Sequence, residues 1–240
     1  MPDTHSLNDI IAFFARYLPA LQGSVRPSET PVCACTDDKH EDAQMAEIFA
    51  SLADAYPEAG SIYWGCRTWQ LWMWQPVFLG VWAASVQRVC IDFESFTHQM
   101  GDLFTEPYTL PEQTLRILAR EEAIVQTASG LQNRLTRELG RIRPHYLMTD
   151  KLASYFLGDA VLKALAAGHR IGILSKADVP DLAQIWQSAL PLPRHGRLVW
   201  QEEAQEYLVE LTACCQHYRR NGADYCTGCP KTRRKPPEAV

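Results

Sequence analysis

Apolar residues recur at the three- and four-residue spacing of helices over most of the first 190 residues. Five long segments have this pattern and are predicted to be helices, at residues 7–18, 38–56, 60–90, 109–140 and 149–168, with a shorter helix after Pro180. Start and stop signals support them, because Ser6 and Thr149 suit N-caps and Pro111 suits a first turn. Residues 22–38 mix glycine and proline with Ser, Thr and Asp, which predicts a loop.

The segment at residues 60–90 is apolar on nearly all sides and holds five of the seven tryptophans. Such a helix belongs at the centre of a fold, and Pro76 predicts a kink in it. Residues 71–89 are the part of this segment that most resembles a membrane-spanning helix. Gln75, Pro76 and Arg88 interrupt that run and leave it too short. We therefore expect buried core here, with aromatic walls for an organic ligand as the alternative.

The pattern changes after a short stretch with two prolines. Residues 197–201 and 207–212 are β-prone runs that predict a hairpin, and the second leads directly into Cys214. The expected fold is mainly α, with a helical body and a short C-terminal β-hairpin that leads into a small cysteine-rich segment. The domain boundary is predicted between residues 1–195 and residues 196–240.

The charge of the chain limits its partners. A net charge of -5 and a pI near 5.8 argue against a protein that binds nucleic acid by neutralising phosphates. The distribution is uneven, because the residues from Cys214 onward hold six Lys or Arg against two Asp or Glu. The first residues lack the basic start and apolar run of an export signal, which favours a cytoplasmic location. Peripheral association with the inner face of the cytoplasmic membrane stays open.

Four of the eight cysteines lie within sixteen positions: Cys214, Cys215, Cys226 and Cys229. In a reducing compartment such thiols stay free, and four converging sulfurs are the ligand set of a tetrahedral zinc or an iron-sulfur cluster. Gly228 eases the turn between Cys226 and Cys229, so that both sulfurs can face one metal site. The other four are scattered and are expected to behave as small hydrophobic side chains with no assigned role: Cys33, Cys35, Cys66 and Cys90.

The adjacent pair Cys214 and Cys215 bears on the kind of metal. Neighbouring side chains of an extended strand point to opposite faces, so both sulfurs reach one centre only where the strand ends or bends. This suits the spread sulfur positions of a binuclear 2Fe-2S cluster better than a single zinc ion. A zinc site and a segment without metal remain the alternatives. Four cysteines and two irons leave no open coordination site, which favours electron transfer over Lewis-acid chemistry.

The stretch from Cys214 to Lys231 resembles the 2Fe-2S motif of the FhuF-like ferric-siderophore reductases. It consists of the adjacent pair, ten residues, and then Cys226-Thr-Gly-Cys229-Pro-Lys. The resemblance implies a mainly helical body and a 2Fe-2S cluster bound by the four cysteines. It also implies one-electron reduction of siderophore-bound Fe(III) and release of Fe(II) inside the cell. It assigns no substrate-binding residues.

This function agrees with elementary iron chemistry. Hydroxamates and related siderophores supply hard oxygen ligands that hold ferric iron far better than ferrous iron, so one added electron loosens the chelate. A glycine-rich nucleotide fingerprint is absent from the sequence, so an external donor such as a ferredoxin or a flavoprotein reductase is expected. Arg219 and Arg220 are expected to raise the cluster potential. The alternatives are an iron-sulfur redox sensor and a helical scaffold with a structural zinc site.

Overall fold

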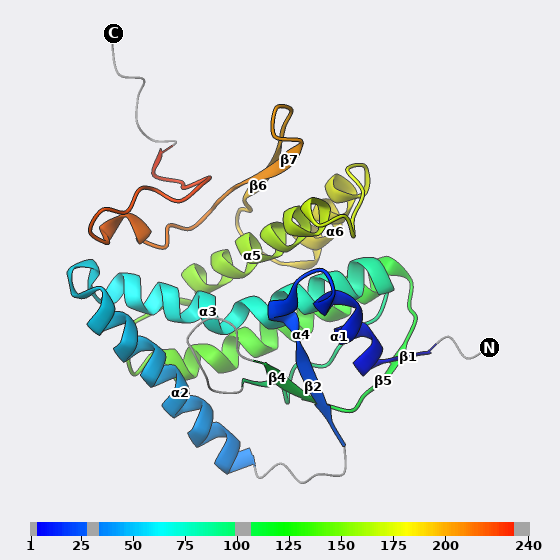
Figure 1. Ribbon diagram of the computed structural model, residues 1–240, viewed down its shortest axis with the longest axis horizontal. Helices are drawn as coiled ribbons and strands as arrows, with labels where there is room; N and C mark the ends of the chain where they lie inside the picture. Colours follow the sequence, from blue (N-terminus) through cyan, green and yellow to red (C-terminus); the bar gives the residue numbers. More distant parts are fainter. Residues whose placement is uncertain (1–3, 28–33, 99–106, 233–240) are drawn as a thin grey trace.

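Helices dominate the architecture, as the sequence pattern predicts. The computed structural model describes residues 4–27, 34–98 and 107–232. Within these stretches lie six α-helices (Figure 1): α1 (Leu7–Ala15), α2 (Ala34–Ala55), α3 (Gly60–Trp82), α4 (Arg120–Ile142), α5 (Asp150–Arg170) and α6 (Asp178–Ala189). Short strands form three small sheets at the edges of the helical body.

Helix α3 is the centre of the helical body. Helices α2, α4 and α5 all pack against it, so most of this apolar helix is buried. Trp69, Trp72 and Trp82 are at most 2% exposed, which confirms the expectation of buried core. The helix passes through Pro76 without a break and continues as a π-helical turn, η3 (Ala83–Gln87). Among the described helices, none is long and apolar enough to span a lipid bilayer.

The helix start expected at residues 109–112 is wrong. The chain there forms β4 (Tyr108–Pro111) and β5 (Thr114–Arg116), and α4 begins only at Arg120. Burial alternates along β4, which is the period of a strand. Thr and Pro open helices but also occur at strand edges, so local signals misplace this start.

The loop expected at residues 22–38 is also only partly correct. Strand β2 (Gly23–Arg26) pairs in parallel with β4, and β3 (Thr97–His98) pairs with the other edge of β4 in antiparallel fashion. Helix α2 begins four residues before the expected start at Asp38, and residues 28–33 lie outside the described chain. The partner of β2 is more than 80 residues away along the chain, so local composition does not reveal this strand. The third small sheet pairs β1 (Thr4–Ser6) with β5.

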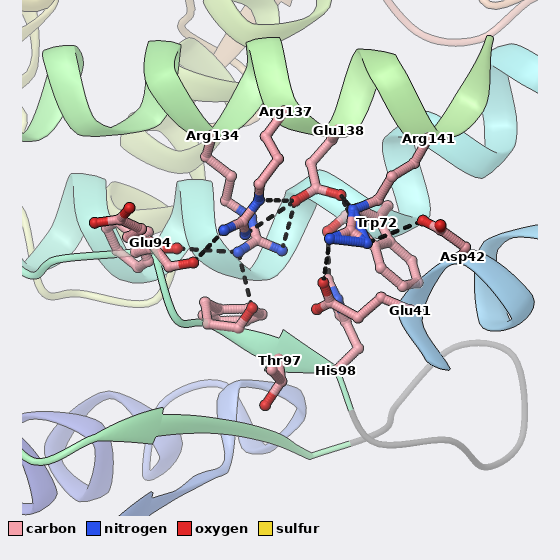
Figure 2. A network of polar contacts seen from close by, with 12 residues as sticks. Glu41, Asp42, Trp72, Glu94, Thr97, His98, Arg134, Arg137, Glu138 and Arg141 are labelled. Carbon is pink, nitrogen blue, oxygen red and sulfur yellow. Dashed lines mark hydrogen bonds and ion pairs between the residues drawn. The ribbon is translucent and has the colours of Figure 1, made fainter. Parts of the chain in front are cut away.

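Helix α4 buries charged side chains as well as apolar ones (Figure 2). Glu138 accepts a hydrogen bond from Trp72 Nε1 at 2.7 Å. It also pairs with Arg134 at 3.3 Å and with Arg141 at 3.2 Å. Arg141 reaches Glu41 of α2 at 3.1 Å, so this charged network joins α2, α3 and α4.

The predicted hairpin is confirmed as β6 (Arg197–Gln201) and β7 (Glu206–Glu210). Strand β7 packs on α5, whose first turn is capped by Thr149 as predicted, with Leu152 N donating to its hydroxyl at 3.2 Å. After β7 the chain returns over the start of α3 through the 3-10 turn η4 (His217–Arg219), seen in orange in Figure 1. The cysteine segment is thereby positioned between α5 and α3. The domain boundary near residue 195 stays a prediction.

Candidate metal centre

A buried carboxylate on α5 fixes the backbone that leads into the first two cysteines. Asp159 is 3% exposed and accepts hydrogen bonds from Thr212 N at 2.8 Å and from Ala213 N at 2.9 Å. Burial raises the pKa of Asp159, and these two backbone donors oppose the rise. The strand pairing ends at Glu210, so the adjacent Cys214 and Cys215 follow a backbone held by Asp159 rather than by a sheet partner.

The loop between Cys226 and Cys229 is a tight turn that also closes onto β7. Cys229 N donates to Cys226 O at 3.0 Å, and Gly228 O accepts from Leu211 N at 2.9 Å. Gly228 has φ +73°, and a Cβ atom there would lie 1.9 Å from Val209 O. Only glycine fits both constraints, which confirms the steric role expected for Gly228.

The structure brings the four thiols together as two pairs. Cys214 Sγ lies 4.0 Å from Cys229 Sγ, and Cys215 shares a thiol hydrogen bond with Cys226. In the described part of the chain, no group of three or more His, Cys, Asp or Glu side chains converges as the ligands of one metal ion do. The two irons of a 2Fe-2S cluster take two sulfurs each, which matches this arrangement in two pairs. The donor set therefore fits a binuclear cluster held by these four residues.

Hydrogen bonds and burial both shift the pKa values of these thiols, in opposite directions for Cys215 and in the same direction for Cys226. The hydrogen bond with Cys226 lowers the pKa of Cys215 to about 6, helped by the His217 backbone N–H and by the charge of Lys163, against burial. Burial raises the pKa of Cys214 to about 11, although the Gln216 backbone N–H opposes the rise. The hydrogen bond with Cys215 raises the pKa of Cys226. Thiolates are the metal-binding form, and N–H donors to cysteine sulfurs tune cluster potentials.

The sequence led us to expect positive charge near the thiols from Arg219 and Arg220, and their effect on the cluster potential stays a prediction. The side chains whose positive charge acts on Cys215 are Lys163 and His217. Arg220 instead lies over the Tyr56 ring, 4.0 Å from its centroid. Beside it, Glu58 accepts the Asn221 backbone N–H at 2.8 Å. Arg220 thus helps to dock the cysteine segment on the turn before α3, and Lys163 supplies the positive charge from α5.

Of the scattered cysteines, Cys66 lies close enough to the clustered thiols for Cys215 and Cys214 to act on it. It is fully buried in α3, and burial, together with these two neighbours, raises its pKa to about 12, so it is a core thiol as expected. Cys90 is half-buried after η3, and burial raises its pKa as well. Cys33 and the side chain of Cys35 lie outside the described residues.

Two separate cavities flank the thiols. The first, here named the aromatic cavity, has a volume of about 360 Å³ and includes Trp69, Trp74, Phe78, Phe156, Lys163 and Cys215 in its lining. The second, named the basic cavity, has about 380 Å³ and is lined mainly by Arg194, His195, Thr212, Cys214, Pro230 and Lys231. The adjacent cysteines therefore face different cavities, as neighbouring residues of an extended chain do.

Sequence reasoning missed several residues around the thiols. Asp159, Lys163 and the aromatic cavity depend on contacts between α5 and the chain after β7, and the basic cavity depends on contacts between the chain before β6 and the chain after β7. No local pattern reports these contacts. One signal was available for Asp159, because it lies four residues after Tyr155 and three before Leu162, on the face expected to be buried. A carboxylate on an apolar helix face needs buried partners. Trp69, Trp72, Trp82 and Trp186 are core residues, as expected, whereas Trp64, Trp74 and Trp200 are half-buried. Trp69 and Trp74 also line the aromatic cavity.

Comparison with known proteins agrees with this geometry. The family model of the FhuF 2Fe-2S C-terminal domain matches residues 212–231, a stretch that includes all four clustered cysteines and the loop between them. No solved structure matches the chain. The match confirms the resemblance seen in the sequence and supports a 2Fe-2S cluster as the cofactor. Over residues 212–231, this chain is similar to the 2Fe-2S C-terminal domain of the FhuF family.

Proposed function

We propose that the protein is a ferric-siderophore reductase. It takes one electron from an external donor and passes it to a siderophore-bound ferric ion in the cytoplasm, which then leaves as Fe(II). The cofactor supplies one-electron transfer at a potential set by hydrogen bonds, burial and nearby charge. The chain itself needs no group that makes or breaks bonds in the organic ligand, and the iron-binding oxygens release the ferrous ion because they favour Fe(III).

The observation that carries this proposal is the aromatic cavity beside Cys215. Trp74 and Phe78 form an edge-to-face pair at 5.8 Å between ring centroids, and both are only half-buried. Lys163 is exposed at the same cavity and adds a positive charge. Organic ligands bind in cavities with apolar walls and few polar groups, and this volume suits one arm of a bulky chelate. A ferric hydroxamate seated here would lie against a cysteine of the centre.

Metal analysis of protein purified without oxygen is the first test. About two irons with sulfide per chain are expected, and one zinc would leave the scaffold alternative in place. The protein is then reduced with dithionite and mixed with a ferric trihydroxamate and a ferrous trap. We expect about one trapped Fe(II) for each cluster that is reoxidised. A cluster that is reoxidised by oxygen but by no ferric chelate would instead favour the redox sensor.

The cavity itself is tested by Phe78→Ala. Removal of this ring should raise the KM for the chelate roughly tenfold and leave the maximal rate nearly unchanged, since the ring binds ligand and transfers no charge. Tyr17→Ala is the matched control, because Tyr17 is an exposed aromatic residue that does not line the cavity. An unchanged KM in Phe78→Ala would remove the aromatic cavity as the binding site.

A further inference from the structure

The basic cavity differs from the aromatic cavity in what it can bind. Arg194, His195 and Lys231 line it together with Cys214, and no acidic side chain is among its lining residues. Arg194 and Lys231 are both exposed, and within residues 4–27, 34–98 and 107–232 neither forms an ion pair. Two unpaired cations beside a cysteine of the centre form a surface that attracts negative charge.

We propose that the basic cavity is the docking surface for an acidic electron-carrier protein, so that electrons arrive on the Cys214 side and leave on the Cys215 side. This inference rests on the proposed function, since it assigns the donor for the same reduction. The reduced carrier loses one electron, the protein gains it, and the ferric ion then takes it and becomes ferrous. No nucleotide or hydride is needed at either surface.

The cations of the basic cavity are held in place. Lys231 lies over the Tyr218 ring, 4.3 Å from its centroid, and donates a hydrogen bond to the Tyr218 hydroxyl. That hydroxyl donates to Gln216 Oε1 at 2.8 Å, and the backbone N–H of Gln216 donates to the Cys214 sulfur. A chain of hydrogen bonds thus connects the surface cation to the first thiol. Preordered side chains lose less conformational entropy on docking than free ones.

Arg194, which also lines the basic cavity, is likewise held against an aromatic ring. Its guanidinium lies 5.3 Å from the centroid of the Tyr155 ring of α5. Cation-π contacts leave the charge available to a partner while they restrict the side chain. Lys231 and Arg194 come from segments on either side of the hairpin, so a docked carrier would contact both ends of the β6–β7 unit.

The charge distribution of the whole chain points an acidic partner to this end. The net charge is -5, and the residues from Cys214 onward carry +4, so the first 213 residues carry -9. An acidic carrier is therefore repelled by most of the chain and attracted by its last part, which steers encounter. Each cavity is also lined by a member of a different thiol pair, since Cys214 pairs with Cys229 and Cys215 pairs with Cys226. Donor and chelate therefore do not compete for one surface.

The test separates the two half-reactions of the holoprotein by stopped-flow absorbance. In the first, oxidised protein is mixed with a reduced acidic ferredoxin at low and at high ionic strength. In the second, dithionite-reduced protein is mixed with a ferric trihydroxamate. The variant is Arg194→Glu combined with Lys231→Glu, and Lys231→Arg tests whether charge alone suffices. Arg116→Glu is the matched control, because it reverses an exposed charge on β5 that lines neither cavity.

We expect the double variant to accept electrons from ferredoxin at least tenfold more slowly at low ionic strength, with the difference lost at high salt. Its reoxidation by the chelate should be unchanged, and Lys231→Arg should behave as wild type. Arg116→Glu should leave both half-reactions within about twofold of wild type. An unchanged ferredoxin rate in the double variant would overturn the docking site, as would a difference from wild type that persists at high salt, or a wild type that ferredoxin reduces no faster than a neutral carrier. If no chelate reoxidises the wild type, the proposed function fails instead.

Discussion

Two polar regions of this molecule differ in the partners that their polar side chains have. The charged network of α4 is buried, and its members bind one another, as Figure 2 shows for Arg134, Glu138 and Arg141. The cysteine segment is half-buried, and its sulfurs contact mainly one another and backbone N–H groups. The first region satisfies its charges with its own side chains. The second assembles four thiols whose sulfurs are close enough to be bridged by metal, so it is built for a cofactor.

The comparison teaches that buried charge alone does not mark a functional site. Arg134 donates to two backbone carbonyl oxygens, at 3.1 Å on Phe93 and 2.9 Å on Phe96, and so fixes the segment before β3. These two hydrogen bonds hold separate elements of the fold together, so the role of Arg134 is structural. Loss of a residue from the network should therefore cost stability, and loss of a residue from the cysteine segment should cost cofactor.

The largest expected effect is that of Cys214→Ser on the cofactor. Serine is a poor ligand for iron in place of a thiolate, so bound iron and the visible absorbance should fall at least about tenfold. The helical body should keep its far-ultraviolet circular dichroism, because Cys214 lies outside the core. Cys90→Ser is the control and should keep the full chromophore. A variant at Cys214 that retains iron and absorbance would break the assignment of this residue as a ligand.

The second effect is the loss of stability in Glu138→Gln. The variant leaves three arginines near a neutral amide, and removal of one partner from a buried ion pair costs about 3 kcal/mol. Urea unfolding followed by tryptophan fluorescence measures this cost. The cluster absorbance in the absence of urea should stay at the wild-type level, which sharpens the contrast with the first prediction.

The control for this measurement is an exposed ion pair of the same kind. Arg143 lies 2.8 Å from Asp150, and both side chains are at least 43% exposed. Arg143→Gln should therefore change the unfolding free energy by less than about 1 kcal/mol. Equal losses in the two variants would show that burial does not distinguish the α4 network from a surface pair.

The difference between the two regions also explains how far sequence reasoning reaches. The thiols could be identified because their spacing and the Gly228 turn are local, and a short loop dictates that chemistry. The hairpin and the Thr149 cap were likewise predicted from neighbouring residues. The α4 network was not predicted, because its members are brought together by packing of helices that are distant in sequence.

The errors in the fold have the same physical origin. Thr109 and Leu110 lie in β4, although a local helix signal covers them, because pairing with β2 decides their conformation. The cavities beside Cys214 and Cys215 likewise combine residues from α3, α5 and the chain on either side of the hairpin. Local chemistry was thus predictable here, and its surroundings required the structure.

The third prediction concerns Asp159, which connects α5 to the backbone that leads into the cysteine segment. In Asp159→Asn an amide nitrogen replaces one carboxylate oxygen, so the charge that strengthens both hydrogen bonds is lost and an N–H donor faces the buried backbone N–H groups of Thr212 and Ala213, at a cost of about 2 kcal/mol. The backbone before Cys214 should then open more often. We expect faster loss of iron to a ferrous chelator, followed by absorbance, with unfolding of the helical body little changed. Asp181→Asn, on the exposed face of α6, is the control and should lose iron at the wild-type rate.

The smallest expected effect is a pH dependence of the unfolding free energy, which arises from Glu41 in the α4 network. Burial, helped by the negative charge of Glu138, raises the pKa of Glu41 from 4.5 to about 7. The folded state therefore binds a proton more tightly than the unfolded state, so this contribution to stability is complete below about pH 4.5 and is lost as the pH rises through 7. Each pKa unit is worth about 1.4 kcal/mol, so between pH 5 and pH 8 the unfolding free energy of wild type should fall by at least about 1 kcal/mol relative to Glu41→Gln. Urea titrations at a series of pH values measure this difference. Parallel profiles of the two proteins would mean that Glu41 stays ionised throughout, held by Arg141, and that the network is closed as an ion pair at every pH.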